Sequence, residues 1–165
     1  MNDQILAKAA ERYGTSCYVF DLDVLQERIT YLRTHLPKGV ALCYAVKANP
    51  FLAGALDPVV DRLEICSPGE LAICSRLGCT SRNYVISGVY KTPEVMHDQF
   101  HRSGDEIYTV ESLSQYQRLK EIALGAGKPM RLLIRLTSGN QFGLAKQDLE
   151  SVLADAQKSS LLHVQ

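Results

Sequence analysis

The chain has 165 residues, 18 basic and 18 acidic side chains, and 46% hydrophobic residues. This length is enough for one globular domain with a core, and the balanced charge argues against binding to nucleic acid or to an anionic membrane. No apolar run approaches the roughly 20 residues of a membrane span, and the N-terminus lacks the basic start and apolar core of a signal peptide, so we expect a cytoplasmic protein.

Helices and strands are predicted in alternation along the chain. The first helix covers 23–36, where leucine and isoleucine recur at steps of three and four, with Asp23 as its cap. Strands are predicted over 40–47, 62–66, 84–87, 106–110 and 130–136, and a sixth begins at Leu161. Helices are predicted over 51–60 (interrupted near Pro58), 67–78, 92–104, 112–124 and 146–158. This pattern is typical of a parallel sheet with right-handed crossovers.

Several of these helices begin with capping signals. Ser67-Pro68-Gly69-Glu70 supplies a cap, a proline at the first position and a glutamate that reaches back. Ser112 with Gln115 forms a similar start. We therefore interpret Ser67 and Glu70 as a structural pair.

The strand predicted over 40–47 ends at a lysine. The run before Lys47 is almost wholly apolar, which is typical of a strand buried on both faces, and Pro50 prevents the strand from continuing. In a barrel of parallel strands, chemistry takes place at the carboxyl ends of the strands. In apolar surroundings the pKa of Lys47 would fall, and the neutral amine would be available to attack a carbonyl. The alternative is a strand-end lysine that extends its ammonium group into solvent.

The segment Tyr44-Ala45-Val46-Lys47-Ala48-Asn49-Pro50 resembles the one that carries the Schiff-base lysine in fold-type III pyridoxal-phosphate (PLP) enzymes. The most similar branch is the ornithine/diaminopimelate/arginine decarboxylase group. Four further blocks resemble the family in order and spacing: Tyr18-Val19-Phe20-Asp21, Glu64-Ile65-Cys66-Ser67-Pro68-Gly69-Glu70-Leu71, Ile86-Ser87-Gly88-Val89-Tyr90-Lys91, and Leu133-Ile134-Arg135-Leu136 with Gln141-Phe142-Gly143-Leu144.

The resemblance implies roles for three residues. Lys47 would form the internal aldimine with PLP, which acts as an electron sink. Glu64 stands where the family has an aspartate on its second strand, beside the cofactor; the alternative is a surface acid. Arg135 ends the fifth strand, and a buried arginine needs an anionic partner. The family places Arg135 under the cofactor, where Glu64 would pair with it.

Other chemically interesting residues have simpler interpretations. Lys91 is expected to be an exposed loop lysine, and Gly143 to occupy a turn that needs glycine. The resemblance places the loop with Phe142 and Gly143 beside the active site, with Gln141 where the family has a lysine. The five cysteines form no C-x-x-C pair and are expected to be small buried hydrophobes. The four histidines show no ligand spacing, so no metal site is predicted.

The predicted fold class is α/β, in the form of parallel (β/α) units of an alanine-racemase-like TIM barrel truncated to five or six strands. No G-x-G-x-x-G follows the first strand, so a dinucleotide-binding open sheet is not supported. A complete barrel takes about 250 residues, and the resemblance implies a C-terminal β-domain as well. Residues 1–165 are thus expected to be the N-terminal part of a PLP-binding barrel, inactive alone and prone to form homodimers or larger assemblies through open strand edges.

Other functions remain open. Racemases of this fold usually carry V-K-A-N-A-Y-G-H-G, whereas Asn49 is followed here by Pro50-Phe51-Leu52, which favours a decarboxylase. A non-catalytic homologue and an aldolase-like Schiff-base barrel are further alternatives. The expected ligand is a small-molecule amino acid, whose identity the sequence does not reveal.

Overall fold

The computed structural model describes residues 3–80, 84–139 and 142–165. The chain divides into two compact units, Met1–Val40 and Ala41–Gln165, which we describe separately. No helix in the described ranges is long and apolar enough to cross a membrane.

The first unit contains two helices, α1 (Asp3–Tyr13) and α2 (Leu22–His35). Helix α1 is not among the predicted elements, and none of its residues is buried. The cap of α2 is Asp21 rather than the predicted Asp23. Its carboxylate accepts hydrogen bonds from the backbone N–H groups of Asp23 and Val24, at 3.2 Å each. These bonds satisfy two of the free donors at the start of the helix.

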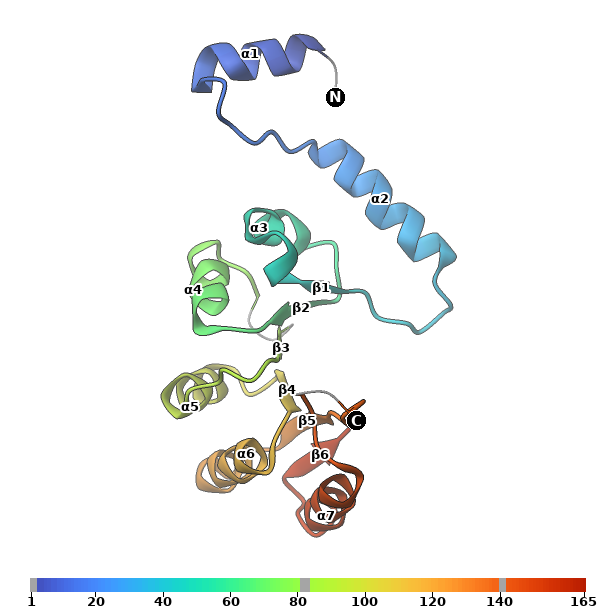
Figure 1. The fold of residues 1–165 in the computed structure, drawn as a ribbon, viewed down its shortest axis with the longest axis vertical. Coiled ribbons are helices and arrows are strands. Elements are labelled where there is room, and N and C mark those ends of the chain that lie inside the picture. The colour runs from blue at the N-terminus through green and yellow to red at the C-terminus, as the bar shows by residue number, and fades with distance from the viewer. Residues whose placement is uncertain (1–2, 81–83, 140–141) are drawn as a thin grey trace. The chain divides into compact units, whose positions relative to one another are not determined.

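The second unit contains a six-stranded sheet in which every neighbouring pair is parallel, in the order β1-β2-β3-β4-β5-β6. The strands are β1 (Cys43–Ala45), β2 (Arg62–Ile65), β3 (Tyr84–Ile86), β4 (Ile107–Val110), β5 (Met130–Ile134) and β6 (Leu162–Val164). Figure 1 shows the helices that follow these strands on one side of the curved sheet. The predicted parallel (β/α) fold is therefore confirmed.

The helices of this unit are α3 (Ala53–Leu56), α4 (Pro68–Arg76), α5 (Pro93–Arg102), α6 (Leu113–Ala126) and α7 (Lys146–Ala156). Two short 3₁₀ helices, η1 (Val46–Ala48) and η2 (Pro50–Leu52), precede α3. The helix predicted over 51–60 is thus a 3₁₀ turn followed by a single α-helical turn. The longer helices agree with the capping signals within a few residues.

The register places alternate residues on opposite faces of the sheet. Ile65, Ile86, Tyr108 and Leu132 form a row of matched partners, and all four are buried. The ring of Tyr108 meets that of Phe100 on α5 edge to face, so this row faces the helices and forms the core. The matched row on the other face contains Ala45, Glu64, Val85, Ile107 and Arg131. Glu64 and Arg131 thus lie on the side of the sheet opposite the helices, in a row with three apolar residues.

Strand β1 is shorter and more exposed than predicted. Cys43 is exposed, and Tyr44 and Ala45 are only half-buried, so the expectation of burial on both faces is wrong. The physical reason is its position at the end of the sheet, where β2 is its only strand neighbour among the described residues. Val46, the first residue of η1, is fully buried.

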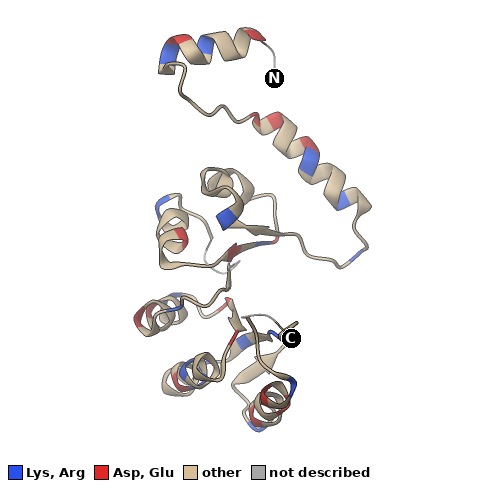
Figure 2. Cartoon of the chain, in the orientation of Figure 1, with Lys and Arg blue, Asp and Glu red and all other residues tan. Residues whose placement is uncertain are grey.

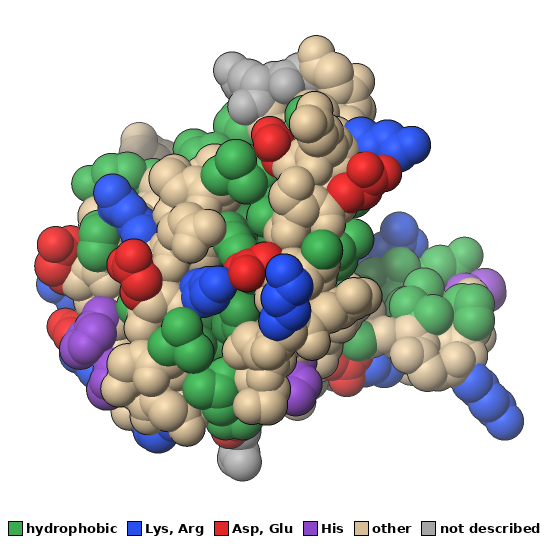
Figure 3. Space-filling view, turned by 90° about the horizontal axis from the view of Figure 1, so that it is seen from below, with side chains coloured by type: hydrophobic (Ala, Val, Ile, Leu, Met, Phe, Trp, Pro, Cys, Tyr) green, Lys and Arg blue, Asp and Glu red, His purple; other side chains and the backbone are tan. Residues whose placement is uncertain are grey.

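The cysteines are all free, but only Cys74 is buried. Cys17 and Cys43 are exposed, which corrects the expectation that all five are buried hydrophobes. Charged side chains of both signs are spread along the helices (Figure 2) and, in the face seen in Figure 3, are interspersed with hydrophobic groups. No single sign of charge dominates, as the balanced composition indicates.

Candidate active site

A hollow of about 330 Å³ lies at the carboxyl ends of the parallel strands. All-parallel pairing brings these ends to one edge of the sheet, where barrels of this type place their chemistry. The three residues predicted for the site, Lys47, Glu64 and Arg135, all line the hollow. Its other lining residues are Cys66, Ser87, Gly88, Val89, Tyr90, Glu111 and Phe142.

Lys47 lies in the 3₁₀ turn that directly follows β1. Asn49 shapes the next turn: its side-chain oxygen accepts from Phe51 N–H at 3.2 Å, and its carbonyl accepts from the Tyr44 hydroxyl at 3.0 Å. The Lys47 amine is 3.9 Å from Glu64 Oε2 and 3.7 Å from Cys66 Sγ. Its side chain is 61% exposed. The prediction that Lys47 lies in apolar surroundings is therefore wrong, because its amine lies beside a carboxylate and at the open face of the sheet.

The end of β2 supplies Glu64 and Cys66, and the start of α4 holds this turn. The Ser67 hydroxyl accepts from Glu70 N–H at 3.2 Å, and Glu70 Oε2 accepts from Cys66 N–H at 2.9 Å. The predicted pairing of Ser67 with Glu70 is confirmed. Burial raises the pKa of the Cys66 thiol, and the nearby charge of Glu64 raises it further.

Arg135 directly follows β5, but its partner is not the predicted one. Arg135 Nη1 donates to Glu111 Oε2 at 3.0 Å, and the guanidinium lies 5.3 Å from the centre of the Phe142 ring. Glu64 instead lies beside Lys47. The expected Glu64–Arg135 pair is therefore wrong, because the nearer carboxylate is that of Glu111, which directly follows the adjacent strand β4. The Arg135 side chain is 50% exposed, so it faces the hollow rather than the core.

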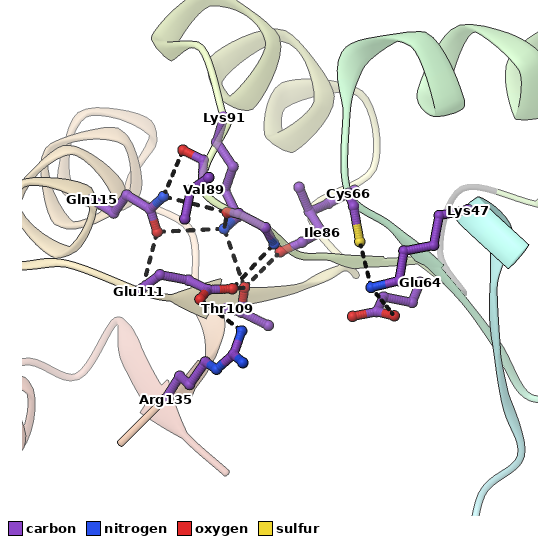
Figure 4. A network of polar contacts seen from close by, with 11 residues as sticks. Lys47, Glu64, Cys66, Ile86, Val89, Lys91, Thr109, Glu111, Gln115 and Arg135 are labelled. Carbon is purple, nitrogen blue, oxygen red and sulfur yellow. Dashed lines mark hydrogen bonds and ion pairs between the residues drawn. The ribbon is translucent and has the colours of Figure 1, made fainter. Parts of the chain in front are cut away.

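Glu111, the most buried charged group lining the hollow, is not among the site residues predicted from the sequence. Its side chain is 2% exposed, and Oε1 accepts from Gly88 N–H at 3.2 Å. Figure 4 shows Glu111 between Arg135 on one side and Gln115 and Lys91 on the other. The signal in the sequence is an acid that directly follows the strand predicted over 106–110 and precedes the capping residue Ser112.

Lys91 is buried, although it was predicted to be exposed. It is 8% exposed, and its amine donates to Gly88 O and, at 3.1 Å, to Thr109 Oγ1. Burial lowers the pKa of Lys91 from 10.5 to about 8, while the charge of Glu111 acts in the opposite direction. The lysine belongs to the layer behind the hollow.

Glycine is required in two turns near the site. Gly143 has φ +91°, and a Cβ there would lie 2.8 Å from Thr137 N and 2.9 Å from Arg135 O, which confirms the predicted turn. Gly88 has φ +82°, and a Cβ there would lie 2.8 Å from Cys66 O. Gln141, at the position of the family's lysine, lies outside the described residues.

The site combines one amine, two carboxylates, a guanidinium and a thiol around an open hollow. Such a set can bind a small molecule that carries an anionic group and a carbonyl carbon open to the amine. Across the described ranges, no three His, Cys, Asp or Glu side chains are grouped as metal ligands. The chemistry that the hollow supports is that of the lysine amine and its charged neighbours.

The family model described as the alanine racemase N-terminal domain matches residues 20–165. A diaminopimelate decarboxylase from Aquifex aeolicus is 34% identical over 133 residues, covering 79% of this chain and 31% of the relative. The chain thus spans about a third of that relative's length.

Solved structures share the fold. A diaminopimelate decarboxylase from Helicobacter pylori in complex with L-lysine superposes with a TM-score of 0.79 at 21% identity, covering 99% of this chain and 45% of that one. A structure of SrLDC in complex with PLP and cadaverine superposes with a TM-score of 0.78 at 22% identity, covering 99% of this chain and 42% of that one.

Proposed function

Because this chain belongs to the family of the alanine racemase N-terminal domain, we propose that it forms part of a PLP-dependent amino-acid decarboxylase in which Lys47 binds the cofactor. The observation that carries the proposal is the position of Lys47: its amine follows the first strand of a parallel sheet and lines a hollow with Glu64 and Arg135. The diaminopimelate decarboxylase relative at 34% identity supports the type of reaction.

The residues lining the hollow fit part of the cofactor. A volume of about 330 Å³ lies within the roughly 300–1,000 Å³ range of small-molecule sites. The Lys47 amine lines the hollow and suits the aldehyde carbon of PLP. In barrels of this type phosphate is held by loops after the seventh and eighth strands, and the described chain contains β1 to β6. We therefore propose that Lys47, Glu64 and Arg135 contact the cofactor's reactive part, and that residues 1–165 form the N-terminal part of a barrel.

Each of the three residues has a separate task in this proposal. When bound, PLP supplies an electron sink that stabilises the negative charge left on the α-carbon as carbon dioxide departs. Lys47 would hold the cofactor through its amine. Glu64, with Oε2 3.9 Å from that amine, would help to orient it in the hollow. Arg135, held by Glu111, supplies a positive charge for an anionic group.

For the substrate we propose a basic or diamino acid, following the diaminopimelate decarboxylase relative. On its own, the 165-residue chain is expected to be inactive and to bind PLP weakly, because β1 to β6 do not include the loops that hold phosphate in such barrels.

Borohydride trapping tests the proposal in the protein that carries this chain. Reduction in the presence of PLP, followed by peptide mapping, should label Lys47. Lys47→Ala should lose both the label and decarboxylation, whereas Lys120→Ala, which removes a lysine paired with Asp155 on the helical side, should retain both. A label on another lysine, or decarboxylation that survives in Lys47→Ala, would overturn the assignment.

A racemase is the second candidate, because the family is named after alanine racemase. The two activities are separated by their products. Incubating the protein with single enantiomers of diamino and basic acids should release carbon dioxide; inversion of the α-carbon without release would favour the racemase.

A further inference from the structure

A buried lysine lies behind the hollow, with each of its three protons directed to an oxygen. The acceptors of Lys91 are Gly88 O, Thr109 Oγ1 at 3.1 Å and Gln115 Oε1 at 3.4 Å. They come from three different segments: the turn after β3, strand β4 and helix α6. None of them is a carboxylate. The ammonium group therefore joins three segments and places a positive charge close to Glu111 without direct contact.

Gln115 reinforces the same junction. Its Nε2 donates to Gly88 O at 3.3 Å and to Val89 O at 3.1 Å, while its Oε1 accepts from Glu111 N–H at 3.0 Å. At the start of α4, Glu70 accepts from Cys66 N–H in the same way. The corresponding arrangement at the start of α6 also includes Lys91 and the turn after β3 (Figure 4). The end of β4 is thus held by two hydrogen bonds, from Lys91 to the Thr109 hydroxyl and from the Glu111 N–H to Gln115.

Glu111 connects this hydrogen-bond network to the hollow. Oε1 is fixed by Gly88 N–H at 3.2 Å, and Oε2 by Arg135 Nη1 at 3.0 Å. A carboxylate that is 2% exposed pays a large desolvation cost unless its oxygens are hydrogen-bonded and positive charge lies nearby. Lys91 supplies that charge on the inner side and Arg135 on the outer side.

We propose that Lys91 is a positioning residue: by fixing the Gly88 turn and Gln115 it holds Glu111, and through Glu111 it aims the Arg135 guanidinium into the hollow. Lys91 itself touches neither the amine of Lys47 nor the open volume. This inference deepens the proposed function, on which the importance of Arg135 for ligand binding rests. The contacts that define the network stand independently of the cofactor.

The test uses two readouts that do not depend on activity. Hydrogen exchange of the Gly88 and Glu111 amides reports the network directly, with the Cys66 amide as the internal control. Modification of arginines by phenylglyoxal, mapped by mass spectrometry, reports how firmly Glu111 holds Arg135. Exposed Arg76 on α4 is its internal control.

Three variants are compared. Lys91→Met keeps a side chain of similar length but removes its hydrogen-bond donors, and Glu111→Gln removes the charge of the carboxylate. Lys120→Met is the matched lysine control. Lys91→Met should speed exchange at Gly88 and Glu111 about tenfold, as expected for the loss of a buried hydrogen bond, and leave Cys66 unchanged. Arg135 should be modified several-fold faster in Lys91→Met and Glu111→Gln, but not in Lys120→Met. If Lys91→Met fails to fold, Thr109→Val should produce a smaller shift in the same direction.

Unchanged exchange and an unchanged Arg135 modification rate in folded Lys91→Met or Thr109→Val would overturn the positioning role. If these shifts occur but borohydride labels no Lys47, the network stands and the proposed function fails. If Lys47 is labelled and the shifts are absent, the proposed function stands and this inference fails.

Discussion

Lys91 shows how burial at a single residue makes stability depend on pH. In the folded chain its pKa is lowered from 10.5 to about 8, chiefly by desolvation, with Glu111 and Cys66 acting against the shift. Between about pH 8 and 10.5 the unfolded state therefore binds more protons than the folded state, and linkage makes the folded state more stable as the pH rises.

The expected result is a rise in the free energy of unfolding of the wild type relative to Lys91→Met across this window. At 1.36 kcal/mol per pKa unit, the rise should reach at most roughly 3 kcal/mol. Urea unfolding of both proteins at a series of pH values measures it. The difference between the two proteins is the relevant quantity, since other groups titrate equally in both. If the free energies of unfolding of the two proteins change in parallel with pH, the lowered pKa of Lys91 is contradicted.

Thiol reactivity gives a second prediction for single residues. Cys74 is fully buried, and burial raises the pKa of its thiol to about 12, whereas Cys17 is exposed. Because the thiolate is the reactive form, iodoacetamide near neutral pH should modify Cys17 and leave Cys74 intact in the folded chain. Both should react in denaturant, which serves as the control. Rapid modification of Cys74 without denaturant would show that α4 opens readily.

At the scale of elements, the turn after β5 depends on one glycine. Gly143 and Gly139 both have positive φ, +91° and +92°, but only Gly143 has backbone atoms where a Cβ would lie. Gly139→Ala should therefore cost about 1–2 kcal/mol for the left-handed backbone alone. Gly143→Ala should cost roughly 3 kcal/mol or more, because the backbone around Arg135 and Thr137 must also move. Thermal unfolding of the two variants measures the difference, and equal costs would contradict the close approach.

The two capping turns show how the same local device serves different purposes. Ser67 with Glu70 and Ser112 with Gln115 each tie the first turn of a helix to the end of the preceding strand. The first fixes the segment that carries Cys66, and the second fixes Glu111. Capping in this sheet therefore stabilises the helices and also sets the positions of side chains at the mouth of the hollow.

At the scale of the whole molecule, the described sheet ends at β1 and β6, each with a single strand neighbour. A closed barrel has no such edges. On the edge strand β6, the apolar side chain of Val164 is 38% exposed. We therefore expect the 165-residue chain to self-associate.

Sedimentation velocity at several concentrations should show species larger than the 18.3 kDa monomer, increasing with concentration. Moderate salt is a useful control, since contacts that rest on apolar side chains and strand edges should persist in it. A monodisperse monomer with a cooperative melt would contradict the expectation.

Much of this molecule could be predicted from local signals. The order of the strands and of the helices from α2 onward follows from apolar periodicity and from caps such as Ser67 with Glu70, all of which act within a few residues. The motif around Lys47 and the turn at Gly143 are equally local. The relatives then agree with the family that the motifs indicate.

The partners inside the site were decided by the tertiary structure. The pairing of Arg135 with Glu111, 24 residues earlier in the chain, depends on β4 lying beside β5 in a particular register. The burial of Lys91 depends in the same way on Thr109 and Gln115, and the exposure of Lys47 on its place at the edge of the sheet. The sequence by itself determined the elements and the lysine at the end of β1, because these arise from neighbouring residues. Which charges meet, and which are hidden from water, was decided only when distant segments packed together, because both depend on distances that chain order does not contain.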